Sequence, residues 1–281
     1  MHTATQRCLG SELRVFGAML KKEVLHLVRY PMWIVVAVTN PFLYLLPVLL
    51  LGSAFAVRGA TPGFAAYTGV QDYVPYLLTG SVLTSYLGTA LWSIGQSLRT
   101  EMLQGTLEQN WLTPTHRITM LLSRTAQSMT RTTLALIIVW AVIWWLFGFK
   151  LTANYGLAFL IILLSFLALV GVGFMFAAFV LLYKEANAVT NMLQISLPLL
   201  IGAYYPVAVL PGWLQVVAKA IPLTYGVDAL RHVLVGSNTL LPLQTEVAIL
   251  AAFAAFTAVA GWQCFKLVER RCRRLGNLGQ Y

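Results

Sequence analysis

Long apolar stretches dominate this chain and limit what it can fold into. Of its 281 residues, 59% are hydrophobic and 10% are charged, whereas soluble domains are about 45–50% apolar and about 25% charged. A chain of this composition cannot cover its own apolar surface in water. Several stretches reach the roughly 17–25 apolar residues that a helix needs to cross a bilayer. The sequence therefore predicts an integral membrane protein with an all-α fold.

Six of these stretches are predicted transmembrane helices. They cover residues 32–57, 73–98, 128–149, 155–182, 187–204 and 243–266. The first contains Pro41 and Pro47, so we expect it to be kinked. It is also too long for the apolar core of a signal peptide, so we expect it to remain as a span. The predicted domains are a cytoplasmic N-terminal tail with an amphipathic helix, a membrane domain and a cytoplasmic basic tail, over residues 1–31, 32–268 and 269–281.

The positions of Lys and Arg orient these spans, because cytoplasmic loops carry an excess of both residues. With both termini in the cytoplasm, fifteen of the nineteen basic residues lie inside and four lie outside. The four outside are Arg58, Lys150, Lys219 and Arg231. This bias predicts cytoplasmic termini and places residues 99–117 and 183–186 in the cytoplasm.

Several function classes do not fit the chain. The net charge of +10 comes from the termini and the loops rather than from one basic face, so we expect no nucleic-acid partner. Cys8, Cys264 and Cys272 form no CxxC motif and no metal-ligand set, so we expect free thiols and no metal. The sequence has no GxxxxGK[ST] motif for phosphate, and no acid lies centrally in a predicted span. We therefore expect no catalytic residue and no cofactor in this chain, and a proton-coupled carrier is disfavoured.

A polar stretch, RTEMLQGTLEQNWLTPTHR at residues 99–117, separates the second span from the third. It predicts a short cytoplasmic helix that ends before Pro114. Its apolar side carries Leu103, Leu107 and Trp111, and its polar side carries Glu101, Gln104 and Glu108. Alone, this pattern fits either a helix that only connects two spans at the membrane surface or a helix that docks on a soluble partner.

Three segments resemble one family of transporters. GTLEQNWLTPTHR, at 105–117, resembles the cytoplasmic segment of ABC-2 type permeases, the membrane subunits of ABC exporters that include daunorubicin-type and polysaccharide or lipid exporters. YYPVAVLPGWLQVVAKAIPLTYGVDALRHVL, at 204–234, resembles the stretch that follows the fifth span in that family. LKKEVLHLVRYP, at 20–31, resembles its amphipathic entry helix. The three segments occur in the family's order and together cover most of the chain.

The resemblance implies roles for these segments. Residues 10–30 are expected to form an elbow helix along the inner membrane surface, residues 99–113 a coupling helix on the ATPase, and residues 205–235 an outer re-entrant hairpin. The residues expected to couple to the ATPase are Glu101, Gln104, Leu107, Glu108, Trp111, Lys184 and Glu185. The residues expected at the outer gate are Tyr204, Tyr205, Pro211, Trp213 and Tyr225.

The resemblance also implies a function. The chain is expected to be the permease subunit of an ATP-driven exporter that moves a drug-like or other amphiphilic molecule across the plasma membrane. Its expected partners are membrane lipids, a second permease copy in a homodimer, and two separate ABC ATPase subunits that bind ATP and Mg²⁺. Export of a lipid-linked polysaccharide or a lipid is the alternative, followed by a carrier or channel that works without an ATPase.

Two sets of polar residues allow more than one interpretation. Asn187, Asn191 and Gln194 recur at i, i+4 and i+7 on the fifth span. They either hydrogen-bond neighbouring helices or line the translocation path. Arg117, Arg124 and Arg131 recur every seven residues. They either anchor a helix at the headgroups, or line an inward cavity or attract an anionic substrate.

Two smaller patterns concern packing. A line of small residues on the second span, which includes Gly80 and Gly88, predicts close contact with another helix. Asp228 and Arg231 are spaced i, i+3 in the predicted hairpin, where we expect a local, exposed ion pair that contributes little.

Overall fold

The computed structural model describes residues 62–70, 72–93, 117–148, 154–183 and 187–275, together with single positions between 17 and 50. Within these residues every regular element is a helix. The elements are α3 (Pro62–Thr68), α4 (Tyr73–Leu91), α7 (Arg117–Phe147), α8 (Tyr155–Tyr183), α9 (Asn187–Leu200), the 3₁₀-helix η2 (Val207–Val209), α10 (Gly212–Ala220), α11 (Pro222–Val235) and α12 (Leu243–Leu275). The all-α prediction is therefore confirmed for the described part of the chain.

Three of the described helices are long and apolar enough to cross a membrane. These spans are Leu122–Phe147 in α7, Tyr155–Leu181 in α8 and Leu243–Arg271 in α12. By contrast, α9 has 14 residues and so measures about 21 Å, which is less than the roughly 30 Å of a hydrocarbon core. The protein is a multi-pass membrane protein, and the number of six spans stays a prediction.

The predicted elbow helix, first span and coupling helix fall largely on residues that the structure does not describe. In the elbow region it describes Gly17, Lys21, Leu25 and Arg29, each in a helical conformation. Residues 94–116 and 184–186 lie outside the described part of the chain. The elbow and coupling helices therefore stay predictions.

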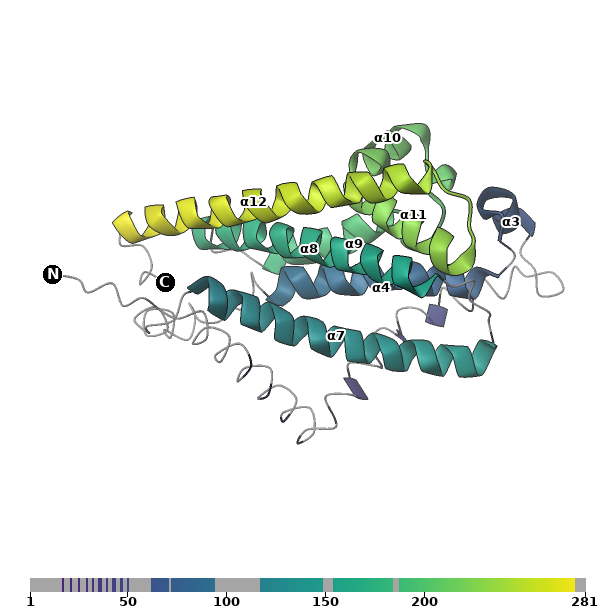
Figure 1. Ribbon diagram of the computed structural model, residues 1–281, viewed down its shortest axis with the longest axis horizontal. Coiled ribbons are helices and arrows are strands. Elements are labelled where there is room, and N and C mark those ends of the chain that lie inside the picture. Colours follow the sequence, from purple (N-terminus) through teal and green to yellow (C-terminus); the bar gives the residue numbers. More distant parts are fainter. Residues whose placement is uncertain are drawn as a thin grey trace.

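The helices of the bundle lie side by side, and in the series α4, α7, α8, α9 and α12 each helix runs opposite to the one before it (Figure 1). Helices α8 and α12 therefore run in the same direction. At one end of the bundle, which we call the hairpin end, α3, α10 and α11 gather where α7 stops and α8 and α12 start (Figure 1). At the other end α7 and α9 start and α8 and α12 stop. We call it the basic end, because the last turns of α12 carry exposed basic side chains. These are Lys266, Arg270, Arg271 and Arg274.

Helix α11 is packed into the bundle rather than lying on its surface. Val227 and Leu230 of α11 are fully buried in one apolar cluster with residues of α4, α8 and α12. Gly226 has no side chain to keep these helices apart. A Cβ at this position would lie 3.1 Å from Ser165 Oγ and 3.3 Å from both Leu250 and Leu83. The position of α11 is therefore set by three long helices at once.

The closest pair of long helices is α8 and α12. Gly171 and Gly261 meet where the two helices cross, and a Cβ on Gly171 would overlap the backbone of Thr257. At the same crossing, Thr257 Oγ1 donates a hydrogen bond to the Ala168 carbonyl oxygen, 3.2 Å away. Small residues allow this approach, as they do in other membrane helix pairs.

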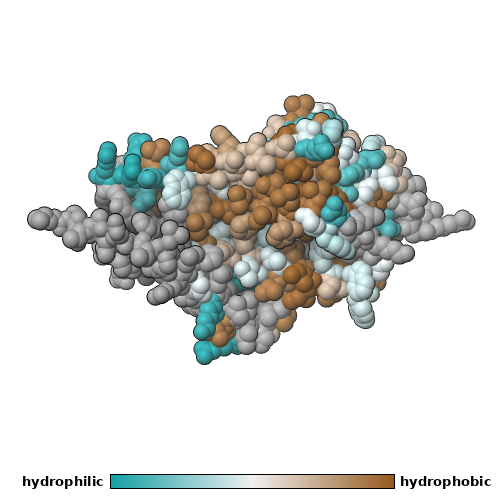
Figure 2. Space-filling view, viewed as in Figure 1, coloured by the Kyte–Doolittle hydropathy of each residue, from teal (hydrophilic) through white to brown (hydrophobic). Residues whose placement is uncertain are grey.

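The outer surface of the bundle is apolar between its two ends. Trp145, Phe159 and Phe256 are 80%, 67% and 65% exposed, respectively. Figure 2 shows a broad hydrophobic region across the middle of the molecule and hydrophilic residues toward its ends. Exposed apolar surface of this extent fits contact with lipid tails or with another membrane protein.

The α8–α12 crossing gives a first prediction. Gly171→Ala would force the two helices apart, and we expect it to destabilise the protein by about 1–3 kcal/mol, as overpacked cores do. Thermal unfolding of the detergent-solubilised chain measures this loss. The matched control is Gly212→Ala, because a Cβ on Gly212 would have no neighbour within 4 Å. Equal unfolding temperatures for the two variants would contradict the close crossing.

Candidate functional site

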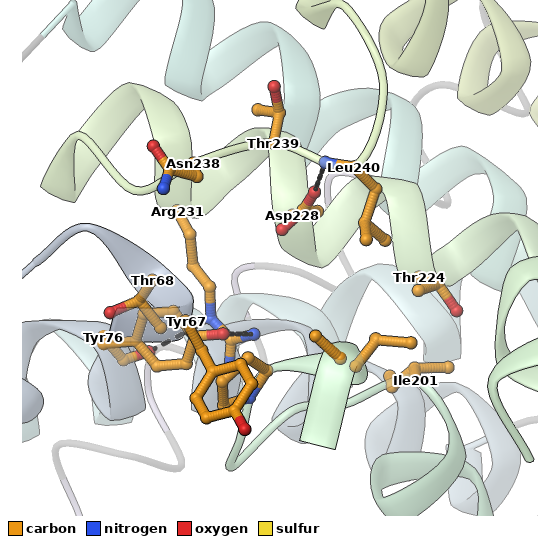
Figure 3. Close-up of a pocket in the computed structure, with 13 residues that line it drawn as sticks. Tyr67, Thr68, Tyr76, Ile201, Thr224, Asp228, Arg231, Asn238, Thr239 and Leu240 are labelled. Carbon is orange, nitrogen blue, oxygen red and sulfur yellow. Dashed lines mark hydrogen bonds between the residues drawn. The ribbon is translucent and has the colours of Figure 1, made fainter. Parts of the chain in front are cut away.

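A small polar pocket lies at the hairpin end, between α4, α11 and the chain that follows α9 (Figure 3). Tyr76, Thr224, Asp228 and Arg231 are among the residues that line it. Its cavity volume is about 80 Å³, whereas pockets for drug-sized ligands measure roughly 300–1,000 Å³. The pocket can hold a few water molecules, each of which occupies about 30 Å³, but no drug-sized substrate.

Arg231 is the central residue of this region. Its side chain is 2% exposed, and its guanidinium donates hydrogen bonds to two segments. Nε and Nη1 donate to the carbonyl oxygen and the hydroxyl of Tyr76, at 3.3 and 3.0 Å. Nη1 also donates to the Gly202 carbonyl oxygen at 2.8 Å, and Nη2 donates to that of Ala203. The guanidinium carbon lies 3.7 Å from the centre of the Tyr76 ring, which adds a cation–π contact.

These bonds make Arg231 a cap for α9. Helix α9 ends at Leu200, and Gly202 then adopts a left-handed conformation with φ of 67°. The carbonyl groups just past a helix C-terminus have no partner in the helix and carry partial negative charge, so a cation is favourable there. A side chain from α11 thus holds the end of α9, and through Tyr76 it holds α4 as well.

Glycine at position 80 makes room for this cap. A Cβ on Gly80 would overlap the Ala203 carbonyl oxygen and would lie 2.6 Å from Arg231 Nη2. The expected close contact along the small residues of the second span is therefore present at Gly80. It brings α4 against the end of α9 and against Arg231.

The sequence-based expectation of an exposed ion pair between Asp228 and Arg231 is wrong. Arg231 is buried and points toward Tyr76 and the end of α9 (Figure 3). The Asp228 carboxylate instead accepts a hydrogen bond from the Leu240 N–H at 2.7 Å. Spacing of i, i+3 placed the two residues on one side of α11, but the tertiary structure gave each a different partner.

The environment of Asp228 is unusual for a carboxylate. Burial raises the pKa of its carboxyl group above the ordinary value, while the Leu240 N–H and the charge of Arg231 partly oppose the rise. Glu246, in the first turn of α12, lies close enough to Asp228 for the two carboxyl groups to interact. The sequence analysis assigned Glu246 no role. The only sequence feature that could have indicated one is its position as an acid close to the start of an apolar span.

A second polar region lies along α9. Asn187, Asn191 and Gln194, predicted to line a path or to bind neighbouring helices, are all exposed on α9. Gln194 also makes an interhelical bond, because its Oε1 accepts from the Trp92 Nε1–H at 2.7 Å. Trp92 follows the last residue of α4, so this bond ties α9 to the end of α4. The interhelical interpretation is therefore confirmed for Gln194, and lining of a path by the strip stays a prediction.

Helix α7 contacts α4 through hydroxyl groups. Thr133 and Tyr86 hydrogen-bond each other at 2.8 Å, and Thr132 and Thr89 do so at 2.7 Å. Arg131, the other residue predicted to line the path, lies next to them in sequence on α7 and is half-buried. The predicted path residues thus lie on two helices, and α4 contacts both.

The residues predicted for the outer gate do not form one cluster. Tyr205 donates its hydroxyl to the Leu199 carbonyl oxygen at 2.6 Å, and Tyr225 donates to that of Lys219 at 2.8 Å. Pro211 precedes the first residue of α10, while Trp213 on α10 is 70% exposed. Tyr204 packs against the apolar core. The two tyrosine hydroxyls therefore bind backbone carbonyl groups of α9 and α10, while Pro211 and Trp213 are both exposed.

The residues predicted to couple to an ATPase lie outside the described residues. They are Glu101, Gln104, Leu107, Glu108, Trp111, Lys184 and Glu185. The helix ends nearest to them in sequence, namely those of α4, α7, α8 and α9, lie at the basic end. Their role as a docking surface stays a prediction.

Comparisons with known proteins agree with the resemblance noted in the sequence. A family model described as ABC-2 type transporter matches residues 14–235. The linearmycin resistance permease protein LnrN of Bacillus subtilis (strain 168) is 28% identical over 122 residues. Those residues make up 43% of this chain and 31% of the relative, so the match spans about a third of that relative's length.

The capping role of Arg231 gives a second prediction. Arg231→Met would leave the carbonyl oxygens of Gly202 and Ala203 without this donor, and a buried acceptor without a donor costs about 1–3 kcal/mol. We expect a large fall in the unfolding temperature, and a smaller fall for Arg231→Lys, which keeps the charge but loses the fork of donors. Lys219→Met is the control, since Lys219 is exposed. If Arg231→Met unfolds like the wild type, Arg231 does not hold the end of α9.

Proposed function

This chain belongs to the ABC-2 type transporter family, and from that premise we propose that it is the permease subunit of an ATP-driven exporter. Two copies form the translocation path, and two separate ABC ATPase subunits bind ATP and Mg²⁺ and supply the energy. As a transport subunit, the chain moves its substrate without catalysing a reaction itself. The substrate is a drug-like or other amphiphilic molecule that leaves across the plasma membrane.

The observation that carries this proposal is the exposed face of α9. Asn187, Asn191 and Gln194 are exposed there beside Met192 and Ile195, which are 69% and 68% exposed. Amide side chains are costly against lipid tails, because the bilayer core offers them no hydrogen-bond partner. A face that mixes amides with apolar side chains suits instead a path for a molecule that has both polar and apolar parts. A second copy that brings its own α9 opposite this face would enclose the path.

The proposed orientation has the basic end in the cytoplasm. Lys and Arg are enriched on the cytoplasmic side of membrane proteins, and the exposed Lys266, Arg270, Arg271 and Arg274 cluster at this end. Both termini are then cytoplasmic, and the segments 94–116 and 184–186 face the ATPase. The hairpin end faces outward, so that η2, α10 and α11 lie where the substrate leaves.

The contacts between helices suggest how ATPase closure reaches the path. Closure of the ATPase subunits displaces the coupling segment between α4 and α7, and the paired hydroxyls of these helices make them move together. The Trp92–Gln194 bond passes the displacement to α9. The far end of α9 is held by Arg231. Arg231 thus holds one end of α9 while the Trp92–Gln194 bond moves the part nearer the cytoplasm. Helix α9 therefore tilts, and its polar face changes position along the path.

The substrate class rests on two further points. The 80 Å³ pocket at the hairpin end is too small for a drug-sized molecule, and we therefore place the path at the interface between two copies. The relative from Bacillus subtilis is named as a resistance permease for linearmycin. We propose export of a drug-like molecule as the corresponding activity for this chain.

Cross-linking of α9 tests the path and the homodimer. In a chain whose native cysteines are replaced by Ser, we expect Asn191→Cys to form a disulfide-linked dimer in oxidised membranes. The reason is that a residue near a two-fold axis meets its own copy. We also expect the cross-link to stop export in reconstituted vesicles and reduction to restore it. The control is Phe159→Cys on α8, whose native side chain is 67% exposed.

Cross-linking of Phe159→Cys but not of Asn191→Cys would place the interface on another face and would refute the proposed path. A cross-linked dimer that exports at the full rate would refute only the role of α9 in transport.

Charge reversal in the coupling segment tests the partnership with the ATPase. We expect the tagged wild-type chain to co-purify from its native membrane with an ABC ATPase, identified by its nucleotide-binding sequence motifs. In the Glu101→Arg/Glu108→Arg variant the interaction should be lost, because the acidic side of the segment is reversed. Glu269→Arg, at the cytoplasmic end of α12, is the matched control and should retain the ATPase. Retention of the ATPase by both variants would show that the acids of 99–113 do not bind it.

A further inference from the structure

Two acidic side chains meet at the junction between α11 and α12. Asp228 projects from α11, and its Oδ2 accepts from the Leu240 N–H at 2.7 Å. Glu246 projects from the first turn of α12, and its Oε1 accepts from the next N–H, that of Leu241, at 3.0 Å. Two successive N–H groups of the connecting loop are thus divided between two carboxyl groups. The pair fastens the loop to both helices.

One oxygen atom of this pair has no hydrogen-bond donor. Glu246 is 0% exposed, and among the described residues its Oε2 has no hydrogen-bond donor. The neighbouring side chain is the carboxyl group of Asp228, which lies close enough to interact with it. Two ionised carboxylates only accept, so the two groups can hydrogen-bond each other only when one of them carries a proton. Without that proton, two like charges would lie side by side in a buried place, which is strongly unfavourable.

Among the described residues around the pair, no basic side chain hydrogen-bonds either carboxyl group in place of the proton. From α11, Arg231 and His232 face Asp228, but the guanidinium of Arg231 is bonded to Tyr76 and the end of α9. The His232 Nδ1 contacts the Ser237 carbonyl oxygen. Helix α4 contributes the neutral phenols of Tyr73 and Tyr76, and the sequence of α8 contains no charged residue. A proton is therefore the species that completes this site.

We propose that Asp228 and Glu246 form a proton-binding site that holds the α11–α12 junction closed. The pair binds one proton between its two carboxyl groups, and the proton belongs to the pair rather than to either residue. The pocket lined by Asp228, Asn238 and Thr239 is partly open and provides a route for the proton. Loss of the proton leaves two adjacent carboxylates whose negative charges repel, and this repulsion releases the loop from α12.

The consequence for transport rests on the proposed function and its orientation. If the hairpin end faces outward, the site senses the pH outside the cell. An alkaline exterior then loosens α11, which carries the Arg231 cap of α9. Export should fall as external pH rises. The proton site itself can be tested without an ATPase or a substrate, so its failure and a failure of the transport proposal are distinguishable.

Infrared spectroscopy of the full chain in lipid nanodiscs tests the site directly. We expect the wild type at neutral pH to show the C=O stretching band of a protonated carboxyl group and to lose it on alkaline titration. The band should be missing in Glu246→Gln and in Asp228→Asn. It should remain in Asp72→Asn, which changes an exposed carboxylate before α4. A wild type without the band, or a band that survives in both site variants, would overturn the proposal.

The pH dependence of unfolding provides an independent test, because a purely structural role of the two side chains would not produce this dependence. The folded wild type holds a proton that the carboxyl groups of the unfolded chain release above about pH 4, so its unfolding temperature should fall as pH rises from about 4 and level off once the pair has lost its proton. The Gln of Glu246→Gln can donate its amide N–H to Asp228 as the protonated acid does, so this variant should remain folded and lose the slope. Asp228→Asn should lose it as well, and Asp72→Asn should keep it. A wild-type slope in both site variants would overturn the proposal.

Discussion

The buried guanidinium of Arg231 is the interaction on which the arrangement of the hairpin end depends. A permanently charged group that is 2% exposed is tolerated only where its donors are satisfied. Here they are satisfied by Tyr76 of α4 and by the carbonyl groups that follow α9. The same carbonyls need donors because α9 stops inside the bundle. One side chain thus meets two requirements at once and joins α11, α4 and α9.

This constraint explains neighbouring features that look unrelated in the sequence. Position 80 has to be glycine, because the carbonyl of Ala203 and the guanidinium occupy the space of a side chain. Gly226 allows α11 to come close enough to α4, α8 and α12 for Arg231 to reach the end of α9. Asp228, one turn before Arg231, is left to the loop and to Glu246 rather than to the arginine. The hairpin is therefore fixed to the membrane helices by polar contacts at its buried side, while Trp213 stays exposed on its other side.

In the proposed transport mechanism, α9 combines one held end with an exposed face. Its hairpin end is capped by Arg231, and Gln194 links it to the end of α4. N-terminal to Gln194, the amides of Asn187 and Asn191 are exposed beside the apolar side chain of Met192, and Ile195 is exposed just after Gln194. In a membrane, such a face needs either another protein surface or a polar path beside it. The other exposed helix faces, with residues such as Trp145 and Phe256, have no such requirement because lipid tails satisfy them.

The sequence by itself determined the class of the fold and the family. Apolar stretches of membrane length require helices, because no other open element satisfies its backbone in lipid. The spacing of Asn187, Asn191 and Gln194 also identified a polar strip without the structure. Only the tertiary structure decided that Arg231 is a buried cap, since i, i+3 spacing shows which side of a helix two residues share but not which other elements lie against that side. The pairing of Asp228 with Glu246 was likewise hidden, because the two groups are eighteen positions apart in the sequence and only the packing of α11 on α12 brings them together.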